Sequence, residues 1–218
     1  MTLDPSLIPE DTVLAACILT RDETLEKDAA AFWLGTVSDR TAQGGGIYTC
    51  AGSRGAAIFR DTGSFDIAGT LSQGDAQSLC REFCKKFSYA EPVFTLDETG
   101  SGTGTALRQW KGGTVVNVSV TFTVSDGTVT AVSGSLLPGT GIDSSEGQPL
   151  LSAFAALTAF QQMRHESSFV VSAITGISLC YELQSTAAAP MTLMPSWQIA
   201  TDTASFYVNC ASGTVRRA

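Results

Sequence analysis

The chain has 218 residues, of which 44% are hydrophobic and 16% are charged, and its formal net charge is -8. This apolar content is too high for a disordered chain, and the length allows one or two domains with cores of their own. An acidic chain is a poor ligand for nucleic acids and for anionic membrane surfaces, because both are bound through lysine and arginine.

The sequence contains no segment typical of a membrane span or a secretory leader. The most apolar stretch, residues 150–160, is too short to cross a bilayer. The first residues lack a basic segment followed by an apolar one. We therefore expect either a cytosolic protein or a chain from which a leader or anchor has been removed.

The N-terminal third of the chain predicts two helices followed by three short strands. Residues 8–20 begin with an acidic turn and carry apolar side chains at helical spacing. A second helix over 25–35 ends at Gly35. The glycines at 44–46 form a loop, and turn residues then separate three strand-like runs, 47–51, 56–60 and 64–68.

The next element is a helix over 72–88. Ser72 precedes it and Asp75 follows three residues later, which is a variant of the capping box. Apolar residues then recur at the spacing of one helix face.

A β-hairpin is predicted over 115–137. Apolar residues at even positions from 116 to 124 alternate with polar ones, and Asp126-Gly127 is a strong turn signal. A two-residue turn there pairs Val124 with Val129, and Phe122 with Ala131. Gly134 in the return strand indicates a bulge or a close approach of another backbone segment.

Residues 138–148 have the composition of a linker, which divides the chain into an N-terminal domain, 1–142, and a C-terminal domain, 148–218. The C-terminal domain has a predicted helix over 149–165 and predicted strands over 169–183, 191–201 and 205–210. Phe154 and Leu157 share the apolar face of this helix. We expect Trp197 to pack against that face as a core residue.

The order of a helix followed by antiparallel strands thus occurs three times along the chain. Runs of helix and strand in this order, with short turns between the strands, favour an α+β fold. We expect amphipathic helices packed on one face of antiparallel sheets, arranged as repeated helix-plus-meander units. The period is too long and too uneven for a solenoid.

Six cysteines are present, and their spacing is not that of a zinc or redox site. Cys80 and Cys84 are four residues apart, so they share a helix face but do not form a CxxC motif. Buried free thiols are the favoured interpretation, with disulfides and metal binding as the alternatives. The full set is Cys17, Cys50, Cys80, Cys84, Cys180 and Cys210.

No residue pattern indicates catalysis, cofactor binding or a metal site. His165 is the single histidine and lies near the end of a predicted helix, where a histidine more often interacts with the helix dipole. The glycine-rich stretch 100–104 lacks the lysine of a phosphate-binding loop and does not begin a helix. We therefore assign no catalytic residue, no cofactor site and no metal ligand.

The remaining candidates for a functional site are aromatic. Trp110, Trp197 and Tyr207 are candidate interaction or structural positions. Tryptophans in such strands are more often core or rim residues, and a platform that binds a peptide or a glycan is the alternative.

The C-terminal sequence resembles the ending of the YycI-like regulatory proteins of Gram-positive bacteria. The segments Met194-Pro-Ser-Trp-Gln-Ile199 and Phe206-Tyr-Val-Asn209, followed by Gly213, are similar to the family pattern L-x-P-x-W-x-I … Y-Y-V-N-A-x-T-G. Upstream, the similar segments are 48–65, 116–117, 132–134 and 150–181. Two positions depart from the pattern, since Val116 replaces the usual phenylalanine and Cys210 precedes the last turn.

This resemblance implies a PepSY-like α+β architecture and a regulatory role without catalysis. It implies that the chain is a soluble fragment on the extracytoplasmic face of the cell membrane, lacking the N-terminal anchoring helix of the family. The implied partner is a sensor histidine kinase of a two-component system, or a paralogous regulator of the YycH type. Membrane association would occur only through the missing anchor.

Two other classes of function stay open at this point. The first is a module that binds a small ligand or peptide, or acts as an inhibitor, through a groove between a helix and the curved sheet. The second is an enzyme of an unrecognised class. An exposed apolar patch would favour the regulatory role, whereas a deep pocket with converging polar groups would favour the alternatives.

Overall fold

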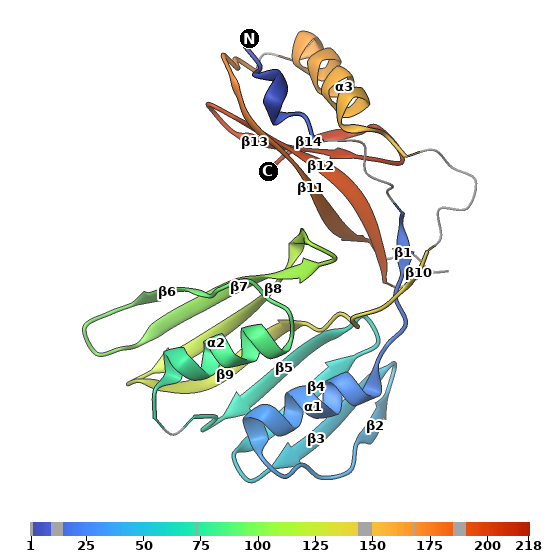
Figure 1. Cartoon of the computed structure of the whole chain (residues 1–218). Coiled ribbons are helices and arrows are strands. Elements are labelled where there is room, and N and C mark those ends of the chain that lie inside the picture. Colours follow the sequence, from blue (N-terminus) through green and yellow to red (C-terminus); the bar gives the residue numbers. More distant parts are fainter. Residues whose placement is uncertain (1, 10–14, 73, 144–149, 168, 185–190) are drawn as a thin grey trace. The chain divides into compact units, whose positions relative to one another are not determined.

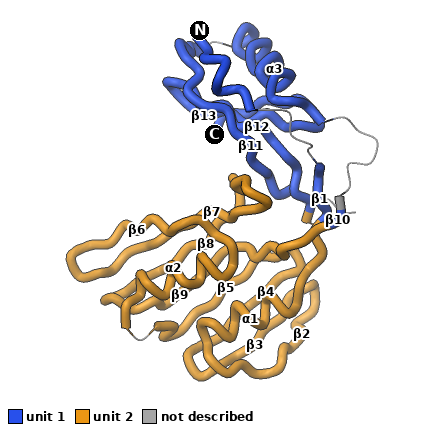
Figure 2. The backbone as a smooth tube through the Cα atoms, viewed as in Figure 1, with its two compact units in different colours: residues 1–18, 142–184, 192–218 blue, residues 19–141, 185–191 orange. Residues whose placement is uncertain are grey.

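The structure is a computed structural model, and it describes residues 2–9, 15–72, 74–143, 150–167, 169–184 and 191–218. Figure 2 shows two compact units. Unit 1 comprises residues 1–18, 142–184 and 192–218, and unit 2 comprises residues 19–141 and 185–191. The domains expected from the sequence, 1–142 and 148–218, differ from these units mainly in where the first 18 residues belong.

Unit 2 contains an antiparallel sheet and two helices (Figure 1). The strand order across this sheet is β2-β3-β4-β5-β9-β8-β7-β6. The helices are α1 (Glu23–Leu34) and α2 (Ala76–Lys86), and the strands are β2 (Thr41–Gly44), β3 (Ile47–Gly52), β4 (Gly55–Arg60), β5 (Ser64–Gly69), β6 (Val93–Leu96), β7 (Gly102–Trp110), β8 (Gly113–Ser125) and β9 (Thr128–Ser135).

Aspartates begin both helices of unit 2. The side chain of Asp22 accepts hydrogen bonds from the backbone N–H groups of the first turn of α1, which have no partner within the helix. Asp75 caps α2 in the same way, so this helix begins four residues later than the predicted 72–88. Ser72 has a different role, because its hydroxyl accepts a hydrogen bond from the Val129 backbone N–H at 2.8 Å.

The core of unit 2 lies where both helices meet β8. The ring of Trp33 on α1 lies 5.3 Å from that of Phe83 on α2 and 6.0 Å from that of Phe122 on β8, measured between centroids. All three side chains are fully buried. Burial of large aromatic side chains contributes the main stabilisation of a core of this kind.

The hairpin of β8 and β9 forms at the predicted turn, with a register that differs in part. Asp126 and Gly127 have positive φ angles of 48° and 72°, and Val124 pairs with Val129 as expected. The pairing of Phe122 with Ala131 is wrong: Phe122 pairs with Val132, because a β-bulge between Thr123 and Val124 shifts the register.

The return strand shows why a glycine stands at position 134. A Cβ atom there would lie 2.5 Å from the carbonyl oxygen of Ser119 on β8. The prediction of a close backbone approach at Gly134 is therefore confirmed.

Unit 1 is built around β12, which pairs with β11 along one edge and with β1 and β13 along the other. Strand β1 also pairs with β10, and β13 pairs with β14. The elements are a short 3-10 helix (Pro5–Leu7), β1 (Cys17–Ile18), β10 (Ile142–Asp143), α3 (Ala153–Glu166), β11 (Ile174–Gln184), β12 (Thr192–Thr201), β13 (Ser205–Asn209) and β14 (Val215–Arg217).

The helix predicted over 8–20 is wrong where the structure describes it. Residues 10–14 of that range lie outside the described residues, and Cys17–Ile18 is a strand. These two residues pair with Leu193 and Thr192 of β12. Pairing with a strand distant in sequence overrides the local helical spacing, as tertiary contacts often do.

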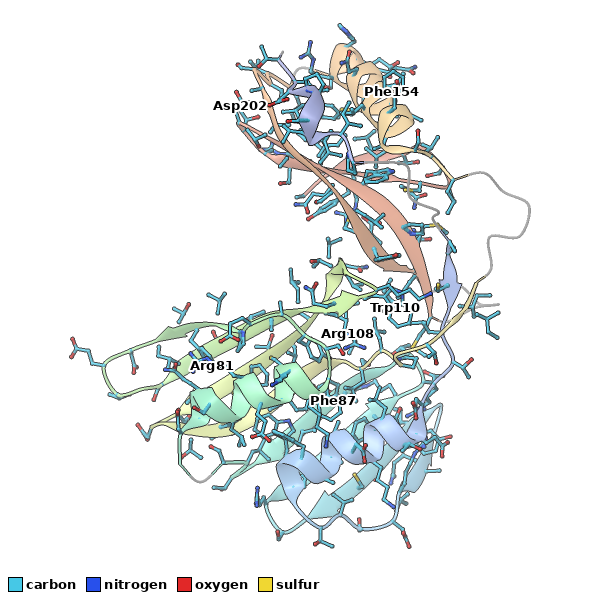
Figure 3. All side chains as sticks on the ribbon, viewed as in Figure 1. Arg81, Phe87, Arg108, Trp110, Phe154 and Asp202 are labelled. Carbon is cyan, nitrogen blue, oxygen red and sulfur yellow. The ribbon has the colours of Figure 1, made fainter. Side chains whose placement is uncertain are left out.

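Trp197 is a core residue of unit 1, and part of its expected surroundings is wrong. It is 2% exposed and packs in one cluster with Leu157 and Phe160 of α3. Phe154, however, is 71% exposed on the outer side of α3 (Figure 3). The buried stripe of α3 runs through Ala153, Ala156, Leu157 and Phe160, which is the i, i+3, i+4, i+7 pattern of one helix face.

The expected fold class is wrong. Among the residues that the structure describes, 47% lie in strands and 20% in helices, so sheet dominates rather than helices covering sheets. The first two helix-plus-meander units are also not separate, because β5 pairs with β9 and joins their strands into one sheet. Three α-helices occur among the described residues, and none of them is long and apolar enough to span a bilayer.

Candidate functional site

The two tryptophans singled out in the sequence are both buried. The indole N–H of Trp197 donates a hydrogen bond to the Leu151 carbonyl oxygen at 2.9 Å. Trp110, at the end of β7 (Figure 3), is 3% exposed, with the Lys111 ammonium 5.8 Å from its ring centroid. Neither ring offers an open face on which a peptide or a sugar could stack.

Tyr207 is half-buried, and a charged side chain covers its ring. The guanidinium carbon of Arg216 lies 4.4 Å from the ring centroid, and Arg216 donates hydrogen bonds of 2.6 and 2.9 Å to Glu182. Burial raises the pKa of Tyr207.

A small polar pocket of about 260 Å³ lies beside Tyr207, and its wall includes Asn209. The side chain of Asn209 already accepts hydrogen bonds from two backbone N–H groups.

A larger pocket, of about 460 Å³, lies in unit 2 between α1, the connection from α1 to β2, and the sheet. We call it the helix–sheet pocket. Its apolar lining consists of Val37 from the connection, Cys50 from β3 and Phe59 from β4. Its charged lining comes from the first turns of α1 and from the connection, and consists of Glu23, Glu26, Lys27, Asp39 and Arg40.

Backbone hydrogen bonds fix the connection that forms one wall of this pocket. Gly35 ends α1 with a φ of 78°, a conformation that favours glycine. The Ser38 N–H then donates to the Ala51 carbonyl at 2.7 Å, and the Ala51 N–H donates to the Ser38 hydroxyl at 3.0 Å. The wall is therefore attached to β3 rather than being a free loop.

A buried carboxylate lies at the base of α1 beside the pocket. Glu26 is 4% exposed, and Arg21 donates to both of its oxygens, from Nε at 2.6 Å and from Nη2 at 3.1 Å. The third Arg21 nitrogen, Nη1, donates to the Gly46 carbonyl at 3.1 Å. A buried charge requires such a partner, because an unpaired one would lose its hydration without compensation.

A second arginine completes this network. The Arg40 guanidinium carbon lies 3.4 Å from the ring centroid of Tyr48, and the Arg21 guanidinium carbon lies 4.5 Å from the same centroid. Arg40 Nη1 is 2.9 Å from a carboxylate oxygen of Glu23 and 3.8 Å from one of Glu26. The result is a continuous cluster of two arginines, two glutamates and one tyrosine.

Cys50 is the cysteine most accessible to reagents. It is half-buried in the pocket lining, whereas the other five cysteines are buried. All six are free thiols, as the sequence favoured. Burial, with a smaller effect of the Glu26 charge, raises the pKa of the Cys50 thiol. Burial raises the pKa of four others to about 12, namely Cys80, Cys84, Cys180 and Cys210.

Arg108 on β7 is a buried charge that the sequence did not single out. It is 4% exposed and donates to the backbone carbonyls of Phe87, at the end of α2, and of Leu137, the latter at 2.7 Å. Its guanidinium lies 5.5 Å from the Tyr89 ring centroid, and burial lowers its pKa. Because it binds two backbone carbonyls, Arg108 ties the end of α2 to the chain after β9 (Figure 3).

The arrangement in the helix–sheet pocket is suited to binding. Its thiol is protonated at neutral pH because its pKa is raised, and its buried carboxylate is held by two hydrogen bonds from Arg21. His165 is exposed on α3, in the other unit. Within the described ranges, no three His, Cys, Asp or Glu side chains are grouped so that they could hold a metal ion.

Sequence reasoning did not find this pocket, because its walls come from residues 23–59 on four different segments. The one local signal was the acidic first turn of α1, with Glu23 and Glu26, which is common to many helices. Nothing in the spacing of Arg21, Arg40 and Tyr48 indicates that they meet.

Comparisons with known proteins assign no family. No protein-family model matches the chain, and no curated protein is similar to it in sequence. An uncharacterized protein from Eubacterium rectale is similar in structure with a TM-score of 0.43 and 10% sequence identity, over 94% of this chain and 84% of the other. The Bacillus megaterium YpeB C-terminal domain has a TM-score of 0.42 and 13% identity, over 91% and 98%.

Both TM-scores are below 0.5, so neither likeness assigns a fold family or a function to this chain. Neither of these two structures is described as YycI-like. The resemblance to YycI-like proteins therefore has no support from them.

Proposed function

We propose that the chain is a non-enzymatic binding module that takes a small ligand in the helix–sheet pocket. The observation that supports this is the pocket itself, whose lining combines apolar and charged side chains. Sites for small molecules have this composition and span roughly 300–1,000 Å³. Among the functions that the sequence left open, this proposal corresponds to the module that binds a small ligand through a groove between a helix and the sheet.

The ion cluster beside the pocket supports a preformed site. Arg21, Glu26, Arg40 and Tyr48 hold the start of α1, the start of β2 and the strand β3 in one arrangement. A rigid wall lowers the conformational cost of binding, because fewer side chains must be ordered when the ligand enters.

The regulatory role implied by the resemblance is the second candidate, and one exposed surface of unit 2 could serve it. The face of the unit 2 sheet away from the core carries small, mostly uncharged side chains that are exposed or half-buried. Consecutive cross-strand partners on this face are Thr49, Ile58, Asp66, Ser133, Thr121 and Thr105. Under this candidate the face binds a sensor kinase or a paralogous regulator outside the cytoplasm, and Thr121→Arg weakens that complex.

Cys50 allows a direct test of the proposed pocket. Treatment with N-ethylmaleimide should modify Cys50 first, since the other thiols are buried, and the adduct should fill the pocket. A fragment library is then screened by protein NMR against three samples: untreated protein, treated protein, and treated Cys50→Ser protein.

The proposal expects fragments that shift the signals of residues 23–59 in the untreated protein. The same fragments should lose binding in the adduct and retain it in the treated Cys50→Ser control. Fragments that bind the adduct as well as they bind the untreated protein would place the ligand site elsewhere. Turnover of a substrate would contradict the non-enzymatic assignment.

A further inference from the structure

We infer that the ligand of the helix–sheet pocket is a small zwitterion with an apolar side group, of the class of free amino acids and dipeptides. This inference rests on the proposed function, because it names the chemistry of the ligand at that same site. It follows from three features of the pocket: the charges left unpaired, the apolar lining, and the volume.

The first feature is the set of charges that remains once the ion pairs of the site are taken into account. Five charged residues line the pocket. Glu26 is held by Arg21, and Glu23 lies 2.9 Å from Arg40. This leaves Lys27 and Asp39, both exposed and without an ion-pair partner among the residues that the structure describes.

The pocket therefore presents one free ammonium group and one free carboxylate group at its rim. A ligand with a single charge would meet one favourable and one unfavourable group. A ligand with one charge of each sign can place its carboxylate near Lys27 and its ammonium near Asp39. Charge complementarity of this kind gives specificity, because the wrong charge pattern is rejected.

The second feature is the apolar lining. Val37, Cys50 and Phe59 present two hydrocarbon side chains and a protonated thiol, which behaves as a small hydrophobic group. Hydrocarbon buried here leaves water at a gain of roughly 25 cal/mol per Å². The apolar lining thus favours a ligand whose uncharged part is aliphatic or aromatic.

The third feature is size. The pocket volume of about 460 Å³ lies in the lower part of the range for small-molecule sites. An amino acid or dipeptide can occupy such a volume, whereas a longer peptide would extend beyond it. The guanidinium nitrogens of Arg40 are covered by protein atoms, so the accessible cation of the lining is Lys27.

Three matched probes test this inference on the full-length protein. L-Leucine carries both charges, 4-methylpentanoate has the same carbon skeleton with only the carboxylate, and 3-methylbutylamine has the side chain with only the ammonium. Binding is measured by NMR titration of residues 23–59. The inference expects leucine, or the dipeptide leucyl-leucine, to bind roughly two- to fivefold more tightly than either singly charged probe, because each of those probes lacks one charge.

Variants of the two free charges separate their contributions. Asp39→Asn should reduce the affinity for leucine and leave that for 4-methylpentanoate unchanged or higher. Lys27→Gln should reduce the affinity for leucine and leave that for 3-methylbutylamine unchanged or higher. Asp126→Asn in the β8–β9 turn and Lys85→Gln on α2 are controls, since neither residue lines the pocket.

Two results would overturn the inference while leaving the proposed function intact. One is binding of a singly charged probe at least as tightly as the zwitterions. The other is no shift with any of these probes, while library fragments still bind to the untreated protein and not to the Cys50 adduct. If library fragments also bound the Cys50 adduct as well as they bind the untreated protein, both the inference and the proposed function would be overturned.

Discussion

The guanidinium carbon of Arg40 lies 3.4 Å from the centre of the Tyr48 ring. Arg21 contacts the same ring with its guanidinium carbon at 4.5 Å. The Tyr48 ring thus contacts two guanidinium groups, whose charges are balanced by Glu26 and Glu23. This cluster connects residues that are up to 27 positions apart in sequence, from Arg21 to Tyr48.

Replacing Tyr48 tests whether the ring stabilises the cluster. Tyr48→Leu removes both cation–ring contacts, and we expect it to lower the free energy of unfolding by about 1–2 kcal/mol, the range for partly desolvated pairs. Tyr48→Phe keeps the ring and should cost much less. Urea denaturation measures both. Equal effects of the two changes would show that the hydroxyl, not the ring face, matters.

Glu26 should be the most sensitive charged position beside the pocket. Its side chain is 6% exposed, and Glu26→Gln leaves the Arg21 charge buried without a carboxylate. Breaking a buried pair in this way costs about 3–5 kcal/mol. Glu23 is the matched control, because its side chain is 74% exposed and Glu23→Gln should cost roughly 0–1 kcal/mol. Similar unfolding free energies for the two variants would contradict the buried network.

The two aromatic residues that the sequence placed together in unit 1 should behave very differently. Trp197→Ala removes a ring that is 2% exposed and a hydrogen bond to Leu151, and we expect a loss of about 3–5 kcal/mol. Phe154→Ala changes a side chain that is 71% exposed and should alter stability by less than about 0.5 kcal/mol. Thermal unfolding followed by circular dichroism distinguishes them. A large loss of stability for Phe154→Ala would show that this side chain is buried rather than exposed.

Stability should fall in alkaline solution because of the buried thiols. Burial raises the pKa of Cys80 and Cys84 to about 12, from about 8.5 in an unfolded chain. The folded state therefore holds these protons more tightly than the unfolded state. This stabilisation is complete below the unfolded pKa and is lost as pH rises from about 9 toward 12.

Urea denaturation at several pH values above 9 measures this loss. The double variant Cys80→Ala, Cys84→Ala should be less stable at neutral pH, because two buried side chains are shortened. Its stability should nevertheless decline less steeply between pH 9 and 12 than that of the parent protein. If the stability of the parent protein and the double variant declined equally steeply, the loss of stability at alkaline pH would come from other groups.

Much of the secondary structure could be predicted, because its signals are local. The strands near 47–52, 55–60 and 64–69 follow from short apolar runs between turn residues. The Asp126-Gly127 turn follows from two residues that tolerate positive φ. Trp197 could be placed in a core because apolar and polar residues alternate along its strand, and the apolar face of such a strand is buried.

Other features could not be predicted, because they depend on pairing between distant segments. Residues Cys17–Ile18 lie in a segment whose apolar residues recur at helical spacing, and they form a strand because they pair with β12 and β10. The bulge between Thr123 and Val124 depends on how β8 meets β9, and the single sheet of unit 2 depends on β5 meeting β9. None of these pairings leaves a periodic signal in its own segment.

The sequence by itself determined several strands and turns, among them the strands near 47–52, 55–60 and 64–69 and the Asp126-Gly127 turn. These elements follow from hydrophobic alternation and turn chemistry, which are local properties of the chain. The tertiary structure alone decided the sheet-dominated fold and the helix–sheet pocket. That pocket exists because α1, the connection after Gly35 and the strands β3 and β4 converge, bringing Arg21, Glu26, Arg40 and Tyr48 within contact distance.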